Sequence, residues 1–111
     1  MAGKFEIYKD KAGEFRFRLK ASNGQTILAS EGYKSKDACR NGIASVQKNG
    51  PDATRFERKV AKSGKHHFVL KAGNHQVIGT SELYESERAM EAGIASVQKN
   101  SASTAIDDST G

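Results

Sequence analysis

The chain contains an internal repeat, which limits its possible folds more than any other feature. The eight residues GIASVQKN occur at positions 42–49 and again at 93–100. When the chain is aligned with itself at an offset of 51 residues, the separation of Gly42 and Gly93, the match extends without a gap over most of its length. Such a tandem duplication predicts two copies of one supersecondary unit. Side chains present in only one copy do not form a site common to both.

Each copy predicts three strands followed by one helix. Residues 15–20, FRFRLK, alternate apolar and basic side chains, which is typical of a strand with one buried face. Asn23-Gly24 after this strand predicts a type I′ hairpin turn, in which both central residues have positive φ; Asn74 takes the matching position in the second copy. The predicted strands are 4–9, 15–20 and 26–30 in the first copy and 55–60, 66–71 and 77–81 in the second.

The predicted helices begin after Ser35 and Ser86, whose hydroxyls can accept a hydrogen bond from the first helical turn. A glycine inside a helix costs about 0.5 to 1 kcal/mol relative to alanine, so a repeated glycine on the buried face predicts a close approach of helix and sheet. The residues that share this buried face at helical spacing are Cys39, Gly42, Ile43 and Val46 in the first copy and Met90, Gly93, Ile94 and Val97 in the second.

Each repeat is too short to bury a substantial core by itself, so we expect the two copies to share one core. The connection from Gly50 to Ala53 is short. We therefore predict one α+β domain over residues 1–111, with repeats at 4–50 and 55–101, one mainly antiparallel sheet and both helices on one face. Residues 102–111 are predicted to form a largely flexible tail, with a short strand around Thr104 to Ile106.

Composition narrows the functional classes. The chain has 18 Lys and Arg against 13 Asp and Glu, a net charge of +5 that permits attraction to phosphate polyanions. No apolar stretch approaches the ~18 to 20 residues of a membrane-spanning helix, and the first residues lack the apolar region of a secretory signal. The single cysteine cannot form an intrachain disulfide. A cytoplasmic protein without a membrane partner is expected.

These patterns resemble the YegP-like family, uncharacterised bacterial proteins built from units of about 50 residues that often occur in tandem. The motifs that carry the resemblance are NGQTILASEGY at 23–33 and NHQVIGTSELY at 74–84, each followed by GIASVQKN. The resemblance implies paired β3-α-β motifs with pseudo-twofold symmetry and exchanged last strands, here Arg55 to Val60 and the tail near Ile106. It also implies a monomer built as an internal pseudo-dimer, and it brings no reaction, substrate or cofactor.

No catalytic or metal-binding pattern stands out. His66 and His67 are neighbours in a predicted strand and point to opposite faces, and no histidine occurs in both copies. Cys39 lies on the apolar helix face, which favours a buried structural thiol. Glu31 and its counterpart Glu82 are more typical of bonds to backbone or basic groups than of acid-base catalysis. The sequence predicts a non-enzymatic protein with no cofactor and no metal.

One candidate binding surface is a nucleic-acid face on the open side of the sheet. If Phe17 and its apolar strand neighbours face the helices, the intervening basic residues face outward, with Tyr8 and His67 beside them. Glu6 and Glu57 are expected on the same face, which weakens its basic character. Basic side chains with an aromatic on an exposed sheet are typical of single-strand binding. Outward strand positions are polar in any sheet of this kind, so the same pattern also fits a plain solvated face. The residues of the candidate nucleic-acid face are Arg16, Arg18, Lys20 and Lys71.

A second candidate surface lies on the helices, where repeated polar residues project away from the buried face. These residues are Gln47, Lys48, Gln98 and Lys99. Core packing does not account for them, although a recent duplication would also preserve identity. The sequence thus favours a binding or interaction module, with weak nucleic-acid binding as the alternative.

Overall fold

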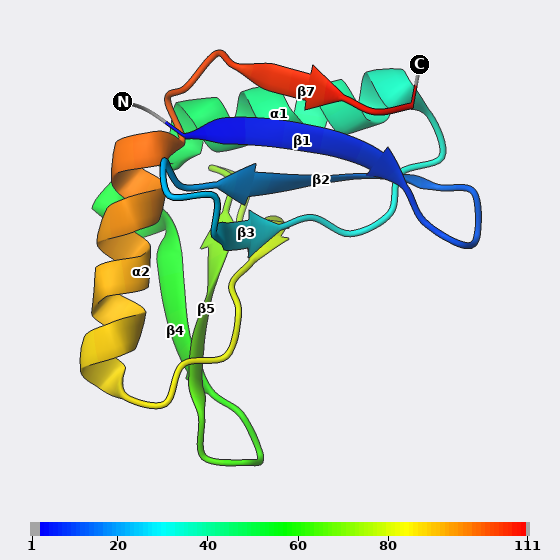
Figure 1. The fold of residues 1–111 in the computed structure, drawn as a ribbon. Helices are drawn as coiled ribbons and strands as arrows, with labels where there is room; N and C mark the ends of the chain where they lie inside the picture. Colours follow the sequence, from blue (N-terminus) through cyan, green and yellow to red (C-terminus); the bar gives the residue numbers. More distant parts are fainter. Residues whose placement is uncertain (1–2, 111) are drawn as a thin grey trace.

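The computed structural model describes residues 3–110, which form one seven-stranded sheet with two helices (Figure 1). The strand order is β4-β5-β6-β3-β2-β1-β7, and every neighbouring pair is antiparallel except β1 and β7. The predicted α+β fold is confirmed. The elements are β1 (Lys4–Lys9), β2 (Phe15–Lys20), β3 (Thr26–Ala29), α1 (Lys36–Asn49), the 3-10 turn η1 (Ala53–Arg55), β4 (Phe56–Val60), β5 (His66–Lys71), β6 (Val77–Thr80), α2 (Glu87–Asn100) and β7 (Ile106–Asp108).

The two repeats meet at the centre of the sheet, where β3 lies beside β6 and Ala29 pairs with Thr80. Leu28 and its counterpart Gly79 face each other near this pseudo-twofold axis. A Cβ on Gly79 would lie 2.7 Å from the Leu28 side chain. The duplicated sequence is therefore asymmetric here because the space on the axis holds only one large side chain.

Both helices pack on the same face of the sheet and cover one core. Each helix contacts strands of both repeats, α1 against β2, β5 and β6 and α2 against β2, β3 and β5. The two units are consequently not separate bodies. The fully buried large side chains come from both copies: Phe5, Ile7, Phe17, Leu19, Leu28, Ile43, Val46, Phe68, Leu70, Met90 and Val97.

The helix starts and the helix glycines agree with the sequence. Ser35 Oγ accepts a hydrogen bond from the Ala38 N–H at 3.1 Å, and Ser86 does the same in the second copy. The close approach at Gly42 involves the Tyr33 ring, because a Cβ there would lie 2.6 Å from Tyr33 Oη. Tyr33 itself stacks on Phe17 with ring centroids 6.3 Å apart.

The turns between the second and third strands differ from the predicted type I′ geometry. Gly24 has a φ of 85° and His75 a φ of 69°, whereas neither Asn23 nor Asn74 has a positive φ. The Gly24 N–H bonds to the Ala21 carbonyl, so the loop is a turn followed by one left-handed residue. The prediction was wrong because it assigned positive φ to the asparagines, whose Oδ1 atoms instead accept from the N–H two residues ahead.

The two outer edges of the sheet are unlike. β7 covers the outer edge of β1 in a parallel pairing, with Phe5 beside Ile106 and Ile7 beside Asp108. The segment that follows α1 becomes β4, which pairs with β5 as the first strand of the second repeat. Arg55 to Val60 thus serves as the first strand of the second repeat and does not cover the outer edge of that repeat as β7 covers β1. No described strand lies beyond β4. β4 therefore forms an open edge of the sheet (Figure 1).

Residues 102–110, where the sequence predicted a largely flexible tail, make specific contacts. Ser103 Oγ donates to the Gly3 carbonyl at 2.6 Å, and the Phe5 N–H donates to the Ala105 carbonyl at 2.9 Å. Asp108 accepts from Lys36 Nζ at 2.9 Å and from Arg40 Nη2 at 3.3 Å. Polar tail side chains thus dock on the first repeat.

Candidate functional site

The basic residues of the candidate nucleic-acid face are engaged in ion pairs. Arg16 Nε lies 2.7 Å from Asp10 Oδ2, and Arg18 Nε lies 2.6 Å from Glu6 Oε1. Glu6 also contacts Lys20 at 3.4 Å. In the second repeat Lys71 pairs with Glu57. Each of the four predicted basic residues therefore has a carboxylate partner.

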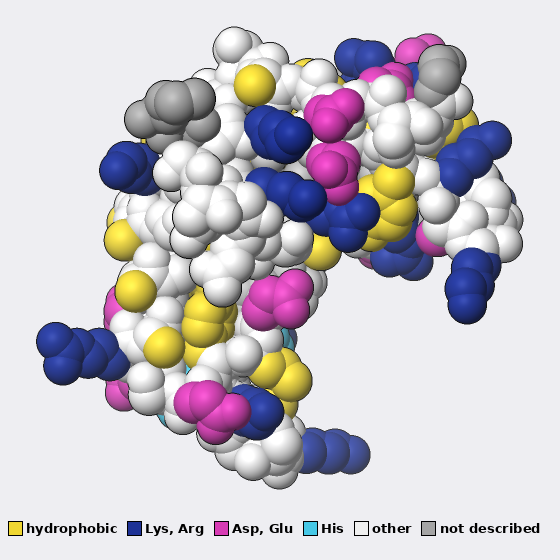
Figure 2. Space-filling view, in the orientation of Figure 1, with side chains coloured by type: hydrophobic (Ala, Val, Ile, Leu, Met, Phe, Trp, Pro, Cys, Tyr) yellow, Lys and Arg dark blue, Asp and Glu magenta, His cyan; other side chains and the backbone are white. Residues whose placement is uncertain are grey.

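The carboxyl groups of these pairs stay ionised. Burial alone would raise the pKa of Glu6, but bonds from Arg18 and Lys20 outweigh burial and lower it. The bond from Lys71 lowers the pKa of Glu57. The Arg18 guanidinium also lies over the Tyr8 ring at 4.2 Å, so this aromatic face is covered. Figure 2 shows basic and acidic side chains interspersed on the visible face, with no continuous basic patch.

The candidate helix surface is only partly free. Gln47 Nε2 donates to the Ser103 carbonyl at 2.9 Å, so Gln47 holds the segment that leads into β7. Lys48 and Lys99 are exposed. Gln98 is half-buried, and within residues 3–110 it makes no bond equivalent to that of Gln47. Sequence reasoning missed the Gln47 contact because the two copies share the residue but not its partner.

The open edge of β4 presents backbone groups that no other strand in the described part of the chain pairs with. On β5, Phe68 directs its carbonyl to β6, where it accepts from the Ser81 N–H at 2.9 Å. Phe68 is paired with Arg58, and alternate residues of an antiparallel strand bond to opposite neighbours. The Arg58 N–H and carbonyl consequently point outward. The Phe56 N–H does the same, since Phe56 matches Phe5, which donates outward to Ala105.

A hollow of about 240 Å³ lies between β4 and α2. We call it the β4–α2 hollow; its lining residues are Arg58, Lys59, Val60, His66, Glu87 and Met90. At the repeat offset these residues match Ile7, Tyr8, Lys9, Phe15, Lys36 and Cys39. In the first repeat that region is occupied by the end of β7, because the Ser109 N–H bonds to the Ile7 carbonyl and Lys36 bonds to Asp108.

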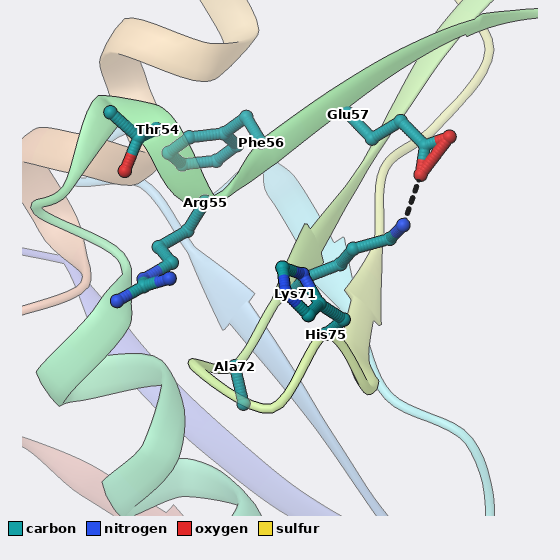
Figure 3. A pocket seen from close by; sticks show the side chains of 7 residues that line it. All are labelled: Thr54, Arg55, Phe56, Glu57, Lys71, Ala72 and His75. Carbon is teal, nitrogen blue, oxygen red and sulfur yellow. Dashed lines mark ion pairs between the residues drawn. The ribbon is translucent and has the colours of Figure 1, made fainter.

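A second hollow, of about 330 Å³, lies at the other end of β4 (Figure 3). We call it the turn hollow; it is lined by Thr54, Arg55, Phe56, Glu57, Lys71, Ala72 and His75. Figure 3 shows Lys71 turned toward Glu57 and Arg55 turned away from that pair. A matching hollow of about 390 Å³ lies in the first repeat. Its lining residues are Gly3, Lys4, Lys20, Ala21, Ser22 and Gly24, together with Ala105 from the segment that leads into β7.

The turn hollow carries more polar side chains than its first-repeat match. Thr54 stands where the first repeat has Gly3, and His75 where it has Gly24. His75 adopts its positive φ although residues with a Cβ disfavour it. Arg55 Nε is buried and 3.5 Å from Asp52 Oδ2, without hydrogen-bond geometry. Both hollows thus flank β4 and differ from their first-repeat equivalents.

The groups with intrinsic chemical reactivity are not brought together. Cys39 is fully buried, and burial raises its pKa to about 11, so the thiol stays protonated near neutral pH. Within residues 3–110 no group of three or more His, Cys, Asp or Glu side chains is placed to hold a metal ion. Neither α1 nor α2, at 14 residues each, is long and apolar enough to cross a bilayer in the described part of the chain.

Comparison with known proteins agrees with the repeat. The family model described as "Domain of unknown function (DUF1508)" matches twice, over residues 10–57 and 61–108, at the same offset of 51 residues. The protein YegP of Escherichia coli strain K12, a UPF0339 protein, is 51% identical over 99% of this chain and 100% of its own length. The chain belongs to the UPF0339 (YegP) family. This confirms the resemblance to the YegP-like family.

Other UPF0339 proteins are similar along the whole chain. The UPF0339 protein in the ptx operon 5′ region of Stutzerimonas stutzeri is 64% identical over 90% of both chains. The solution NMR structure of yegP from E. coli, titled a protein of unknown function, has a TM-score of 0.94 and covers 100% of this chain and 96% of its own. That of UPF0339 protein SO3888 from Shewanella oneidensis is 48% identical, with a TM-score of 0.91 over 97% of this chain and 92% of its own.

Proposed function

We propose that this UPF0339 protein is a non-enzymatic interaction module that binds an extended segment of a partner protein along the open edge of β4. The observation that carries the proposal is that only one of the two sheet edges is covered by another strand. β7 covers β1, whereas no strand of residues 3–110 pairs with the outward backbone groups on the equivalent edge of β4. An exposed strand edge is the usual site for addition of a peptide strand, which gains main-chain hydrogen bonds.

Edge strands often avoid such pairing by being short or charged. The charged side chains of β4 are engaged in ion pairs, however, and Lys59 lies 3.7 Å from Glu57. Arg58 is held by Glu91 of α2, with Nη2 2.9 Å from Oε1, and Glu57 is held by Lys71. Val60, at the end of the strand, is 64% exposed. The edge therefore combines accessible backbone with apolar surface.

The test is affinity capture from an extract of the cells that produce the protein, with a pair of variants at one position. Arg58→Pro removes the outward N–H and places a ring on the edge without breaking a bond to β5. Arg58→Ala removes the same side chain and keeps the N–H. We expect partners captured by the native chain to be retained by Arg58→Ala and lost with Arg58→Pro. Equal capture by both variants would exclude the β4 edge.

The helix surface and the nucleic-acid face are examined in the same series. Lys48→Glu combined with Lys99→Glu should leave capture unchanged. Weak nucleic-acid binding is the second candidate, favoured by the net charge of +5. The carboxylate partners of Arg16 and Arg18 oppose it. An anisotropy titration with single-stranded DNA at low salt tests it, because binding that falls steeply with salt and with Arg16→Ala plus Arg18→Ala would support nucleic acid over protein.

A further inference from the structure

We infer that the segment bound at β4 runs parallel to β4 and carries a lysine or arginine at the position that Asp108 takes in β7. This inference rests on the proposed function and adds to it the direction and charge of the partner. It follows from comparing the two edges residue by residue.

The direction follows from the repeat. β7 runs parallel to β1, bonded through the Phe5 N–H at one end and the Ile7 carbonyl at the other. The matching groups on β4 are the Phe56 N–H and the Arg58 carbonyl. A segment that follows the path of β7 would bond to both and continue into the β4–α2 hollow, which corresponds to the region filled by the end of β7.

The charge follows from the helices. In the first repeat, α1 presents Lys36 and Arg40 to the carboxylate of Asp108. At the matching positions α2 presents Glu87 and Glu91. The helix charges that face this position are thus reversed between the two edges, and an acidic residue here would meet like charge on α2. Arg58, which corresponds to the strand neighbour of Asp108, is already bound by both carboxylate oxygens of Glu91.

Neutralisation within the second repeat is incomplete. Arg58, which stands where the first repeat has Ile7, compensates Glu91. Glu87 lines the β4–α2 hollow and has no ion-pair partner among the described residues. Arg58, Glu87 and Glu91 together carry one net negative charge, and Lys59, which also lines the hollow, is paired with Glu57 at 3.7 Å. A lysine or arginine entering the hollow would supply the missing cation.

This charge pattern also selects among possible occupants. A β7 segment from a second copy would place Asp108 beside Glu87 and Asp107 beside Glu57. Antiparallel pairing of two β4 strands centred on Arg58 would add a second Arg58, already held by its own Glu91, and no free cation to meet Glu87. The site therefore favours a basic segment of another protein over a second copy of this chain.

The turn hollow lies where the bound segment would enter. In the first repeat, Ala105 of the β7 segment lines the matching hollow. The residue of the partner that takes the Ala105 position would lie beside Thr54, Arg55 and His75. This end of the site therefore offers polar side chains, while the basic residue binds at the other end.

The experiment uses two synthetic peptides of the same length. One is STAIDDST, residues 103–110 of this chain; the other is the same peptide with both aspartates replaced by lysine. Each is titrated into the full-length, isotope-labelled protein, and backbone amide shifts and amide hydrogen exchange are followed by NMR. We expect the lysine peptide to shift β4 and the start of α2 and to slow exchange of the Phe56 amide. It should bind β4 roughly fivefold more tightly than STAIDDST, the size of a strong exposed ion pair.

A charge reversal on the protein completes the test. Glu87→Lys should reverse the preference, so that STAIDDST binds β4 more tightly. Glu31→Lys, an exposed substitution of equal charge in the first repeat, should leave the preference unchanged. Circular dichroism verifies that both variants are folded.

The outcomes separate the inference from the proposed function. Equal binding of both peptides, or a preference unaffected by Glu87→Lys, overturns the charge assignment while the Arg58→Pro capture result stands. Absence of peptide binding at β4 overturns the inference as a whole. Protection of the Phe56 amide that rises with protein concentration alone, together with a dimer in light scattering, would overturn it in favour of a second copy.

Discussion

The hydroxyl of Tyr33 lies 2.6 Å from the point where a Cβ on Gly42 would stand. The same relationship occurs in the second repeat, where a Cβ on Gly93 would meet Tyr84. The tyrosine ring stacks on the central phenylalanine of the sheet, Phe17 or Phe68, and the glycine makes room for it. The glycine and the tyrosine are therefore repeated together because each depends on the other for packing.

Gly42→Ala is expected to destabilise the protein by about 1 to 3 kcal/mol, because the methyl group forces the Tyr33 ring out of its stack. Adding Tyr33→Phe removes the nearest atom and should recover part of the loss. Urea unfolding of the two single variants and the double variant measures the coupling. A Gly42→Ala protein more stable than the native chain would mean that helix propensity outweighs the contact.

Gly79→Leu should destabilise the protein strongly, since its side chain would enter the space filled by Leu28. Leu28→Gly alone removes a buried side chain and should cost at least the roughly 2 to 5 kcal/mol typical of Leu→Ala. The exchange variant Leu28→Gly with Gly79→Leu should be more stable than either single variant, because one large side chain again lies on the axis. Thermal unfolding of all three variants checks this, and additive effects would contradict the shared space.

Gln47→Ala should lower the free energy of unfolding by about 0.5 to 1.5 kcal/mol, the net value of one hydrogen bond, because Gln47 Nε2 bonds to the Ser103 carbonyl. Gln98→Ala is the matched control at the same place in GIASVQKN and should change stability less. Amide exchange at Phe5 should also accelerate in Gln47→Ala, since β7 is less firmly held. Equal effects of the two variants would show that this contact is unimportant.

The contacts of Asp108 that hold β7 on the first repeat should be lost only in strong acid. The Thr110 hydroxyl, followed by Lys36, holds the pKa of Asp108 well below its usual range. A carboxylate with a lowered native pKa stabilises the fold above its unfolded pKa of about 3.9, and this contribution is lost as pH falls through the native value. Melting temperatures should therefore lose the Asp108 contribution only below about pH 4.

Asp108→Asn should lower the melting temperature at neutral pH and make its decline in acid shallower. Asp107→Asn is the control, because Asp107 has only a 3.5 Å contact with Lys4. Melting curves followed by circular dichroism give both quantities. Parallel pH profiles for the native and Asp108→Asn proteins would rule out this carboxylate as the acid-sensitive group.

The sequence predicted the elements of this fold well because they depend on local patterns. Alternation gave the strands, and Ser35 and Ser86 marked the helix starts. The repeat further explained why Cys39 and Met90 share a buried position. Ser45 and Asn49 of the repeated octapeptide also have a local role, since Asn49 Nδ2 donates to the Ser45 carbonyl at 2.9 Å.

The candidate site was not predictable in the same way because it depends on contacts between distant residues. The sequence predicts Glu6 on the same face as the basic residues, but only the strand register shows that it pairs with Arg18 and that Asp10 pairs with Arg16. The offset of 51 residues aligns β1 with β4 but does not show that only one of them is covered. The change from Lys36 to Glu87 at matching positions is visible in the sequence. Only the structure shows that Lys36 binds Asp108 of β7, so that the change reverses the charge facing a bound strand.

The parallel pairing of β1 and β7 also determines how the molecule responds to tension. A pull applied at residues 3 and 110 draws the two strands past each other, so the bonds from Phe5 to Ala105 and from Ser109 to Ile7 are loaded together. Stretching the β4–β5 hairpin from its open end loads its antiparallel bonds one after another. The chain should therefore resist force between its ends more strongly than force that opens this hairpin.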